Sequence, residues 1–563
     1  MDTFKPPRGI VVFGGGTATN SLVDVFENLR RSRNCSLQYV IPISDNGGSS
    51  SELIRVFGGP GIGDVRSRLV RLIPRGETDA ERVSLKSLFN HRLSSDPHTA
   101  RSEWLDIVEG RHPRWADISS EKRELIRSIF NHMNMEIVKR ARPSSVFNFA
   151  KASIGNLFLT GARLFTGSLE SAIYLLSTIC GVPSTVTTLP AINSNFTHHI
   201  SAGLEDGSQI TGQNAISHPS APTSLPDTAT VIAEALSTSP TLLALIPTPI
   251  PTSTSSPEAS TPQPPPALPA PSPNPYVRED PQIVLRETEA HDRIEDATLP
   301  GSLPSLRKPY LSFSKSPSSP SANDLPSRIQ RIWYINPYGH EIYPLSNPKV
   351  ISAISQSISI IYSIGSLYTS LIPSLILRGV GQAIASHAPQ KIQKILILNS
   401  EVDRETGPSA NPLTATDFVR AVVRACAEAG HSRSRSRSHS HNKPRTNIET
   451  HGESSTRGED NNEVDADADA DVNVNADVDV DVDMGEDRDE VRKYVTHLLY
   501  LEGEGVPKVN KAELAALGVD CIRVYGRRVG GMLCYDEAGL LGALEAIVGK
   551  GEMVRSRRNT SLR

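Results

Sequence analysis

The sequence has few cysteines and no arrangement of them that would build a metal site or a disulfide framework. Its five cysteines are scattered over 563 residues without a C-x-x-C pair. This pattern predicts free thiols in a reducing compartment. No run of 18 apolar residues occurs, and the first residues lack the apolar core of a signal peptide. We therefore expect neither a membrane span nor secretion, but a cytoplasmic protein, with a nuclear location as the alternative.

The sequence also lacks an excess of charge of one sign and the best-marked catalytic motifs. Its 58 lysines and arginines nearly balance 62 aspartates and glutamates, for a formal net charge of −4. We therefore expect no nucleic acid or membrane partner drawn by a global basic field. No Ser/His/Asp triad or H-E-x-x-H motif is recognised, and the first glycine-rich stretch is not a P-loop because Gly-Lys-Ser/Thr is absent.

Two stretches contain too few core-forming residues to fold. Residues 219–327 are rich in Pro, Ser and Thr, and residues 429–488 contain Arg-Ser dipeptides followed by alternating Asp and Val. The Asp-Val alternation has the period of a strand, but closely spaced aspartates repel one another, so we predict two disordered inserts. The Arg-Ser run suits kinase sites, weak RNA contacts, protein partners or a plain charged insert, and the sequence leaves these alternatives open.

The remaining parts, residues 8–218, 328–428 and 489–551, alternate strand and helix patterns. This alternation predicts an α/β fold with a doubly wound, mostly parallel sheet, whose ligand belongs at the carboxyl ends of the strands. The dipeptide Asp206-Gly207 predicts an accessory antiparallel hairpin with a type I′ turn. Strands are expected at 10–13, 37–44, 184–190, 329–336, 357–365, 393–401 and 521–526, and helices around 22–29, from 52, and at 153–165, 168–180, 348–356, 370–387, 511–519 and 537–549.

Glycine and hydroxyl residues follow three of the predicted strands. The loops are residues 14–17 (GGGT), 45–50 (DNGGSS) and 365–370 (GSLYTS), and each opens a helix. In a doubly wound sheet such loops converge on one crevice, where backbone N–H groups, hydroxyls and helix N-termini favour an anion. We therefore predict a phosphate or diphosphate site, although a merely tight turn is the alternative for the first loop.

Charged and amide residues complete the predicted site. Arg66 suits a bidentate phosphate contact, and Asn156 begins a helix. Asp45 and Asp64 are candidate catalytic residues and candidate ligands of Mg²⁺, which prefers carboxylates and water. Plainer roles are open as well: turn or N-cap residues for the aspartates, an ion pair for Arg66, and a core position for Tyr368 instead of stacking on a base. The candidate ligand-binding residues are Gly14, Gly15, Gly16, Thr17, Asn46, Gly47, Gly48, Ser49, Arg66, Asn156, Gly365, Ser366, Leu367, Tyr368 and Thr369.

Several longer motifs resemble one known family. They are GGGTATNSL, SDNGGSSSELIRVFGGPGIGDVRSRL, SIGNLFLTG, LEDGSQITG, GSLYTSLIPSLILRGVGQAI, TATDFVRAV and LGVDCIRVYG, in this order. The set is similar to CofD-like (UPF0052) proteins, which include archaeal 2-phospho-L-lactate transferase and the bacterial YvcK gluconeogenesis factors, and it is closer to the YvcK side. The likeness covers residues 8–218, 328–428 and 489–551, whereas the two inserts have no counterpart.

The resemblance implies a Rossmann-like fold whose strand-end loops bind a phosphorylated ligand. In the transferase branch, a phospholactyl group passes from a guanosine diphosphate-linked donor to a deazaflavin with the help of magnesium. In the YvcK branch, a nucleotide sugar is bound without an established reaction. The resemblance adds Asp417 to the candidate residues. We therefore expect a nucleotide diphosphate-linked ligand, with group transfer and non-catalytic regulation as the two alternatives, and a homo-oligomer or protein partners as further possibilities.

The sequence departs from the family pattern at four positions. Ala18 replaces the glycine after GGGT, Asn46 replaces an aspartate, Ser51 replaces a glycine, and Leu413 stands where YvcK proteins carry a tyrosine. The loss of a carboxylate at Asn46 removes a negative charge that would meet a metal ion. This departure weakens the case for magnesium-dependent transfer.

Overall fold

The computed structural model describes most of the chain outside the two predicted inserts. The described residues are 8–44, 47, 49–74, 79–142, 146–217, 324–389, 391–438 and 488–560. The predictions of disorder in the inserts therefore fall almost entirely outside them. At three boundaries the described part goes further: residues 324–327 and 488 are described, and helix α17 (Ala415–Ser438) continues into the positions assigned to the second insert. No proline that could end this helix follows before Pro444.

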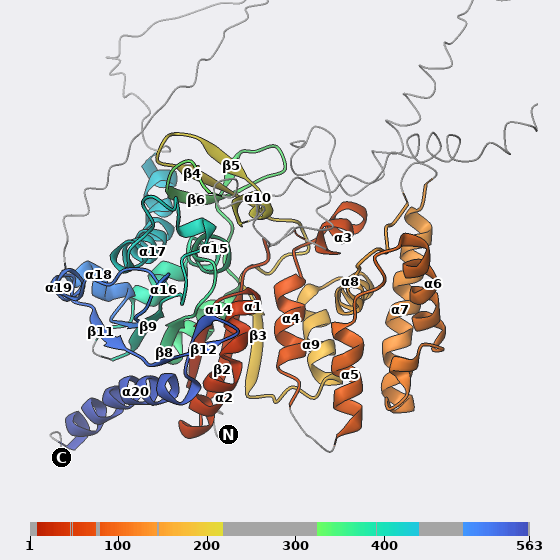
Figure 1. Cartoon of the computed structure of the whole chain (residues 1–563), viewed down its shortest axis with the longest axis horizontal. Coiled ribbons are helices and arrows are strands. Elements are labelled where there is room, and N and C mark those ends of the chain that lie inside the picture. The colour runs from red at the N-terminus through yellow and green to blue at the C-terminus, as the bar shows by residue number, and fades with distance from the viewer. Residues whose placement is uncertain are drawn as a thin grey trace, which may run out of the picture.

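A seven-stranded sheet forms the centre of the molecule (Figure 1). Its strand order is β11-β10-β9-β8-β1-β2-β3, and every neighbouring pair is parallel. All five residues of β1 are buried, as is typical of a parallel strand covered on both faces. The doubly wound, mostly parallel sheet predicted from the sequence is confirmed. The strands are β1 (Gly9–Phe13), β2 (Ser36–Ile41), β3 (Val186–Pro190), β8 (Ser357–Tyr362), β9 (Gln393–Ile397), β10 (His497–Tyr500) and β11 (Asp520–Arg523).

The direction in which the sheet is wound reverses between β1 and β8. From β1 the chain adds β2 and then β3 toward one edge, whereas β8, β9, β10 and β11 extend toward the other edge. In open α/β sheets the ligand crevice lies at such a switch point, outside the carboxyl ends of the strands. The loops after β1 and β8 flank this point.

Helices pack against the sheet and extend beyond its β3 edge, where Figure 1 shows α3 to α9 gathered. Helix α2 lies against β2, and α14 lies against both β1 and β8. Val25, Phe26 and Leu29 of α2 are buried, as their helical spacing predicted. The helices on the N-terminal side are α1 (Gly16–Ser21), α2 (Val23–Ser32), α3 (Ser49–Phe57), α4 (Gly63–Arg71), α5 (Ala80–Asn90), α6 (Pro97–Glu109), η1 (Pro113–Trp115), α7 (Ser120–Arg140), α8 (Ile154–Thr166) and α9 (Leu169–Ile179).

The C-terminal half supplies a second set of helices. Helix α16 packs against α17, and α20 lies against α2 and β9. The elements are α14 (Pro348–Ser355), the π-helical η4 (Leu367–Leu371), α15 (Ile372–Leu375), α16 (Val380–Ala385), η5 (Arg404–Thr406), α18 (Arg488–Tyr494), α19 (Lys511–Ala516) and α20 (Glu537–Thr560). The single helix predicted over 370–387 is wrong, because Gly379 has a φ of +94° and the segment divides into η4, α15 and α16.

A small antiparallel sheet with the order β5-β4-β6-β7 lies beside α10 (Gln213–Ser217) and α15. It contains the predicted hairpin, but not its type I′ turn, which requires positive φ at both central residues. Of Asp206 and Gly207, only Gly207 has a positive φ, +84°. The strands are β4 (His199–Leu204), β5 (Gln209–Thr211), β6 (Ile329–Ile335) and β7 (Glu341–Ile342), and a separate hairpin pairs β12 (Gly526–Val529) with β13 (Met532–Tyr535).

Two further expectations concern the whole chain. All five cysteines are free thiols, as predicted, and those at positions 35, 180 and 426 are buried. Within the described ranges, no helix has the length and apolar character needed to cross a membrane.

Candidate functional site

The glycine turn after β1 packs against the chain itself. Gly14 and Gly16 have φ values of +152° and +67°, which favour glycine. A Cβ atom on Gly14 would lie 2.6 Å from Oγ1 of Thr19. The Thr19 hydroxyl donates a hydrogen bond to the carbonyl oxygen of Ile364 at 2.7 Å. Because Ile364 follows β8, the two loops that flank the switch point are in direct contact.

Asp64, near the start of α4, lies against the same turn. A Cβ atom on Gly15 would lie 2.4 Å from Oδ2 of Asp64, and the carboxylate accepts the backbone N–H of Gly16. Burial raises the pKa of Asp64, while Arg68, this N–H and Arg66 oppose that shift. The group that comes close to Gly15 is therefore the Asp64 side chain of this protein. Its carboxylate also accepts the first backbone N–H of α1, that of Gly16.

Arg68 is buried one helical turn after Asp64. It is 1% exposed, and its Cζ atom lies 4.4 Å from the centroid of the Tyr39 ring. None of its guanidinium nitrogens has a hydrogen-bond partner among the described residues. Burial lowers the pKa of Arg68, and Tyr39 and Asp64 counteract this effect. Arg68 is thus a buried positive charge that interacts electrostatically with Asp64.

Arg66 and Asn156 meet, although they are 90 residues apart. The Nε of Arg66 donates to Oδ1 of Asn156 at 3.3 Å, and its Nη1 donates to Oδ1 of Asn90 at 3.3 Å. The Nδ2 of Asn156 donates to Oγ of Ser50 at 3.4 Å. A Cβ atom on Gly155 would lie 2.7 Å from Cγ of Arg66, so glycine there lets α8 approach α4. These contacts bring α3, α4, α5 and α8 to one place.

The loop after β2 is described only in part. Asp45, Asn46 and Gly48 lie outside the described residues, and Ser49 is the first residue of α3. In the loop after β1, Thr17 likewise lies within a helix, α1. A Cβ atom on Gly47 would lie 2.5 Å from Oδ1 of Asn214, a buried residue of α10. This loop therefore packs against α10, which also contacts η4 and η5. The roles of these loop residues in ligand binding stay predictions.

The loop after β8 is held by the following strand end. Gly365, with a φ of +145°, donates its N–H to Oδ1 of Asn399 and accepts a hydrogen bond from Nδ2 of Asn399, both at 2.9 Å. The carbonyl oxygen of Ser366 accepts the N–H of Ser370 at 2.9 Å. Leu367 is buried at the start of η4. The loop is thus rigidly placed beside the glycine turn.

Two acidic residues that the sequence reasoning missed lie at this loop. Glu405, 1% exposed, accepts the backbone N–H groups of Tyr368 and Thr369 at 2.9 Å each and also the hydroxyl of Thr369. Asp403 caps η5, and its side chain bonds to Ser366. Burial raises the pKa of both acids, to about 8 for Glu405. Both follow the strand predicted at 393–401, so a search after this fourth strand end would have found them.

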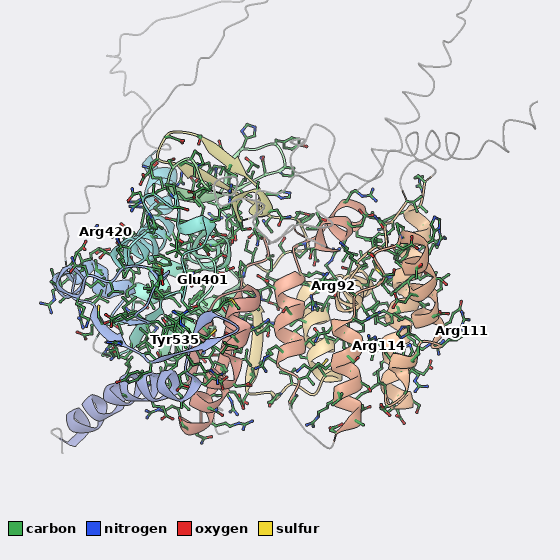
Figure 2. The ribbon with its side chains drawn as sticks, in the orientation of Figure 1. Arg92, Arg111, Arg114, Glu401, Arg420 and Tyr535 are labelled. Carbon is green, nitrogen blue, oxygen red and sulfur yellow. The ribbon has the colours of Figure 1, made fainter. Side chains whose placement is uncertain are left out.

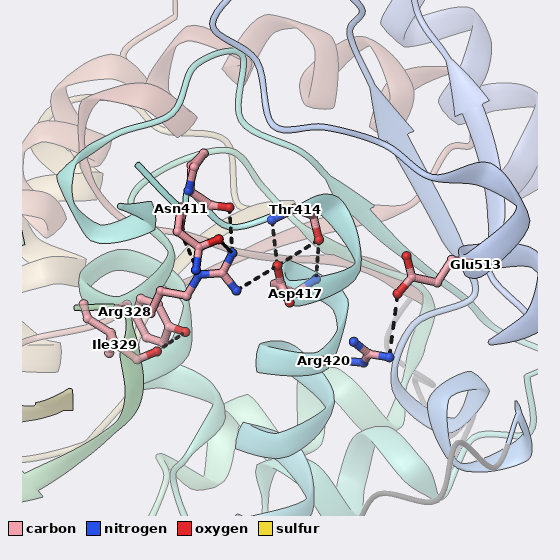
Figure 3. Close-up of polar contacts among 9 residues, drawn as sticks. Arg328, Ile329, Asn411, Thr414, Asp417, Arg420 and Glu513 are labelled. Carbon is pink, nitrogen blue, oxygen red and sulfur yellow. Dashed lines mark hydrogen bonds and ion pairs between the residues drawn. The ribbon is translucent and has the colours of Figure 1, made fainter. Parts of the chain in front are cut away.

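Tyr368 and Asp417 occupy structural positions. Tyr368 is 5% exposed, and its hydroxyl donates to the carbonyl oxygen of Ile329 at 2.9 Å, as in a core position; its stacking on a base stays a prediction. Asp417 accepts the N–H and hydroxyl of Thr414, both at 2.8 Å, and pairs with Arg328 at 3.5 Å (Figure 3). This arrangement caps the start of α17.

The described residues do not by themselves fit a magnesium ion. Of the two predicted ligands, Asp45 lies outside the described residues, and Asp64 faces the glycine turn with Arg66 and Arg68 nearby. Magnesium needs several oxygen ligands in near-octahedral geometry, and two guanidinium charges repel it. No reaction step through magnesium follows from this geometry.

Several known proteins are similar to this chain. The uncharacterized protein YNL011C of Saccharomyces cerevisiae is 41% identical over 397 residues, which cover 70% of this chain and 79% of that protein. A gluconeogenesis factor of Halalkalibacterium halodurans is 25% identical over 209 residues, 37% of this chain and 45% of that protein. A solved UPF0052-family structure from Bacillus halodurans aligns with 96% of this chain and 99% of that chain, at 16% identity and a TM-score of 0.47.

The family model described as "2-phospho-L-lactate transferase CofD" matches residues 10–481, which is most of the chain. The resemblance carried by the sequence motifs is therefore confirmed, and this chain belongs to the CofD family.

Proposed function

We propose that this protein binds a nucleotide diphosphate-linked ligand at the switch point between β1 and β8. The observation that supports this most is the hydrogen bonding of Asn156 to both Arg66 and Ser50. Arg66 lies on α4, which contacts α1 and whose Asp64 lies against the glycine turn. A guanidinium group at a strand-end crevice is well suited to a diphosphate. Arg66 is held by two amide oxygens from different helices, so its position is set before a ligand arrives.

Group transfer is the activity that the family description suggests. In that reaction the acceptor hydroxyl would attack the phosphorus that carries lactate, its proton would pass to solvent, and the diphosphate bond would break. A nucleoside monophosphate would leave. In such a step, Arg66 would stabilise the negative charge that develops on the leaving phosphate.

Binding without turnover is the second candidate. It is favoured because carboxylates of the chain itself occupy two of the predicted anion positions. Asp64 accepts the backbone N–H of Gly16, and Glu405 accepts the backbone N–H groups of Tyr368 and Thr369. Two relatives are named gluconeogenesis factors, one of them only as putative. A regulator that responds to a nucleotide sugar needs Arg66 but no catalytic acid.

Thermal unfolding of the full chain tests the proposal. We expect GDP, UDP or UDP-N-acetylglucosamine to raise the unfolding temperature, because a ligand at 100 times its dissociation constant stabilises by about 2.7 kcal/mol. Arg66→Gln should weaken binding at least about tenfold, since a charge-assisted contact is worth about 1.5 kcal/mol or more. Arg101→Gln is the matched control, because Arg101 is exposed on α6.

The outcomes separate the candidates. Absence of any shift with all three compounds, with or without magnesium, would refute the binding proposal. If a ligand binds, the chain is incubated with a guanosine diphosphate-linked lactate donor and a deazaflavin acceptor. If the wild type releases guanosine monophosphate and Arg66→Gln does not, the result supports group transfer. If the ligand binds but no guanosine monophosphate is released, the result supports a regulator.

A further inference from the structure

Two histidines and one glutamate meet outside the ligand site, on the helical side of the molecule where Figure 2 labels Arg111 and Arg114. His91 follows the last residue of α5, Glu103 lies on α6, and His112 precedes η1. Their ligand atoms all lie within 4.8 Å of one another. Among the described residues, this is the one group of three His, Cys, Asp or Glu side chains placed closely enough to hold a metal ion.

We propose that His91, Glu103 and His112 bind a zinc-class transition-metal ion. Two imidazoles and one carboxylate are an established zinc ligand set, with water in the fourth position. The side chains of the three residues are 14%, 21% and 15% exposed, so the cluster is shielded but reachable from solvent. The ion would be held by neutral imidazoles, which suit zinc better than magnesium or calcium.

The distances are close to those of a metal-bound state. Nε2 of His112 lies 3.6 Å from Oε1 of Glu103, and Nε2 of His91 lies 2.5 Å from the same oxygen. Ligand atoms around a tetrahedral zinc ion are about 3.3 Å apart, as follows from bond lengths of about 2 Å. Metal binding therefore requires the contact of His91 with Glu103 to open by about 0.8 Å, a small side-chain movement.

A neighbouring backbone group orients the carboxylate. Oε2 of Glu103 accepts the N–H of Ser94 at 3.0 Å, so Oε1 is the oxygen that faces both imidazoles. Such supporting hydrogen bonds are usual around metal-binding carboxylates. The backbone at His91 is fixed as well, because its carbonyl oxygen accepts the N–H of Ile154 at 3.0 Å. The Glu103 carboxylate is thus oriented, and the His91 backbone fixed, without a metal.

His112 is the ligand whose hydrogen bonding must change. Its Nδ1 accepts the backbone N–H of Arg114 at 3.3 Å, whereas a histidine that binds metal through Nε2 carries a proton on Nδ1. Loading is therefore expected to break this long contact. The guanidinium of Arg114 adds a positive charge nearby, but it hydrogen-bonds to the hydroxyl of Ser87. A single carboxylate offsets half of the charge of a divalent ion, so the site should be of moderate affinity.

The position of the cluster gives the ion a structural role. Two backbone hydrogen bonds join the segment after α5 to the segment before α8. The N–H of Leu93 donates to the carbonyl oxygen of Ala152, and the N–H of Lys151 donates to that of Ser94, both at 2.9 Å. Asn90, directly before His91, accepts a hydrogen bond from Arg66. A bound ion would fix this end of α5. The metal proposal does not depend on the ligand proposed for the switch point.

Metal analysis of the full chain tests the proposal. The protein is stripped with a chelator, dialysed against excess Zn²⁺ or Co²⁺ and measured by elemental analysis. We expect about one ion per chain and, with cobalt, the visible absorption of a four- or five-coordinate site. Glu103→Gln and His112→Ala should each weaken zinc binding at least tenfold. His98→Ala should not, because His98 is an exposed histidine of α6 outside the cluster.

A wild-type measurement keeps the test independent of whether the variants fold. X-ray absorption at the zinc edge should show nitrogen and oxygen neighbours with two imidazoles and no sulfur. Less than one tenth of an ion per chain after loading, a sulfur-ligated spectrum, or equal losses in His98→Ala and Glu103→Gln would each overturn the proposal.

Discussion

The carboxylate of Glu405 accepts both the backbone N–H of Thr369, at 2.9 Å, and its hydroxyl. With the N–H of Tyr368, it satisfies the donors at the start of η4. An acid of the chain therefore occupies amides that the sequence assigned to a phosphate. Burial raises the pKa of Glu405 to about 8, and the nearby Asp403 adds to the shift.

The first prediction concerns the pH dependence of stability at Glu405. Because its pKa is near 8 when folded and near 4.5 when unfolded, the folded chain binds more protons between these values. The free energy of unfolding contributed by this group is thus greatest below about pH 4.5 and falls as pH rises through about 8. Glu405→Gln should remove this slope and be more stable than wild type at pH 9 by on the order of 1–2 kcal/mol.

Urea unfolding at pH 6 and pH 9 measures this slope. Glu401→Gln is the control, because Glu401 is exposed (labelled in Figure 2) and the same glutamate-to-glutamine change is made. It should leave the pH dependence of the wild type intact. An identical slope in Glu405→Gln and wild type would show that Glu405 is already ionised near its unfolded pKa.

The sequence predicted the sheet well because alternation of strand and helix is a local signal. It also assigned Arg66, at a turn, and Asn156, at a helix start, to one candidate site, and the two side chains form a hydrogen bond. It could not predict what fills the anion positions. Glu405 lies 36 residues from Thr369, and its burial depends on the packing of η4 against η5. The break at Gly379 was missed because its neighbours have an uninterrupted helical pattern.

The second prediction tests whether Gly15 is required by Asp64. Gly15 has a φ of −106°, so alanine meets no backbone strain there, but its Cβ would lie 2.4 Å from Oδ2 of Asp64. Gly15→Ala should therefore destabilise the chain by about 2 kcal/mol, within the range for overpacking. In an Asp64→Ala background the same change should cost less than about 0.5 kcal/mol, because the clashing atom is gone.

Denaturant midpoints of the wild type, two single variants and the double variant complete this cycle. The difference between backgrounds is the informative quantity, since Asp64→Ala has its own cost from the exposed N–H of Gly16 and the unbalanced charge of Arg68. Equal costs of Gly15→Ala in both backgrounds would point to Pro42, whose Cδ would lie 3.3 Å from the added Cβ.

The third prediction compares two glycine-to-alanine changes in helices. A Cβ atom on Gly381 of α16 would lie 1.8 Å from the carbonyl oxygen of Cys426 in α17, and backbone cannot yield as a side chain can. We expect Gly381→Ala to cost about 3 kcal/mol or more. Gly542, exposed in α20, has nothing within 4 Å of such a Cβ atom. Gly542→Ala should stabilise by about 0.5–1 kcal/mol, the usual helix preference of alanine.

Because both substitutions reduce the entropy of the unfolded chain alike, the difference between them isolates the close approach of α16 and α17. Thermal unfolding of the two variants is the measurement, with soluble yield recorded for Gly381→Ala. If both variants unfold at the same temperature, the two helices are further apart than described. A loss of stability in Gly381→Ala alone would show that the backbones of α16 and α17 are in contact. The same packing holds the start of α17, where Asp417 accepts the N–H of Thr414 and pairs with Arg328.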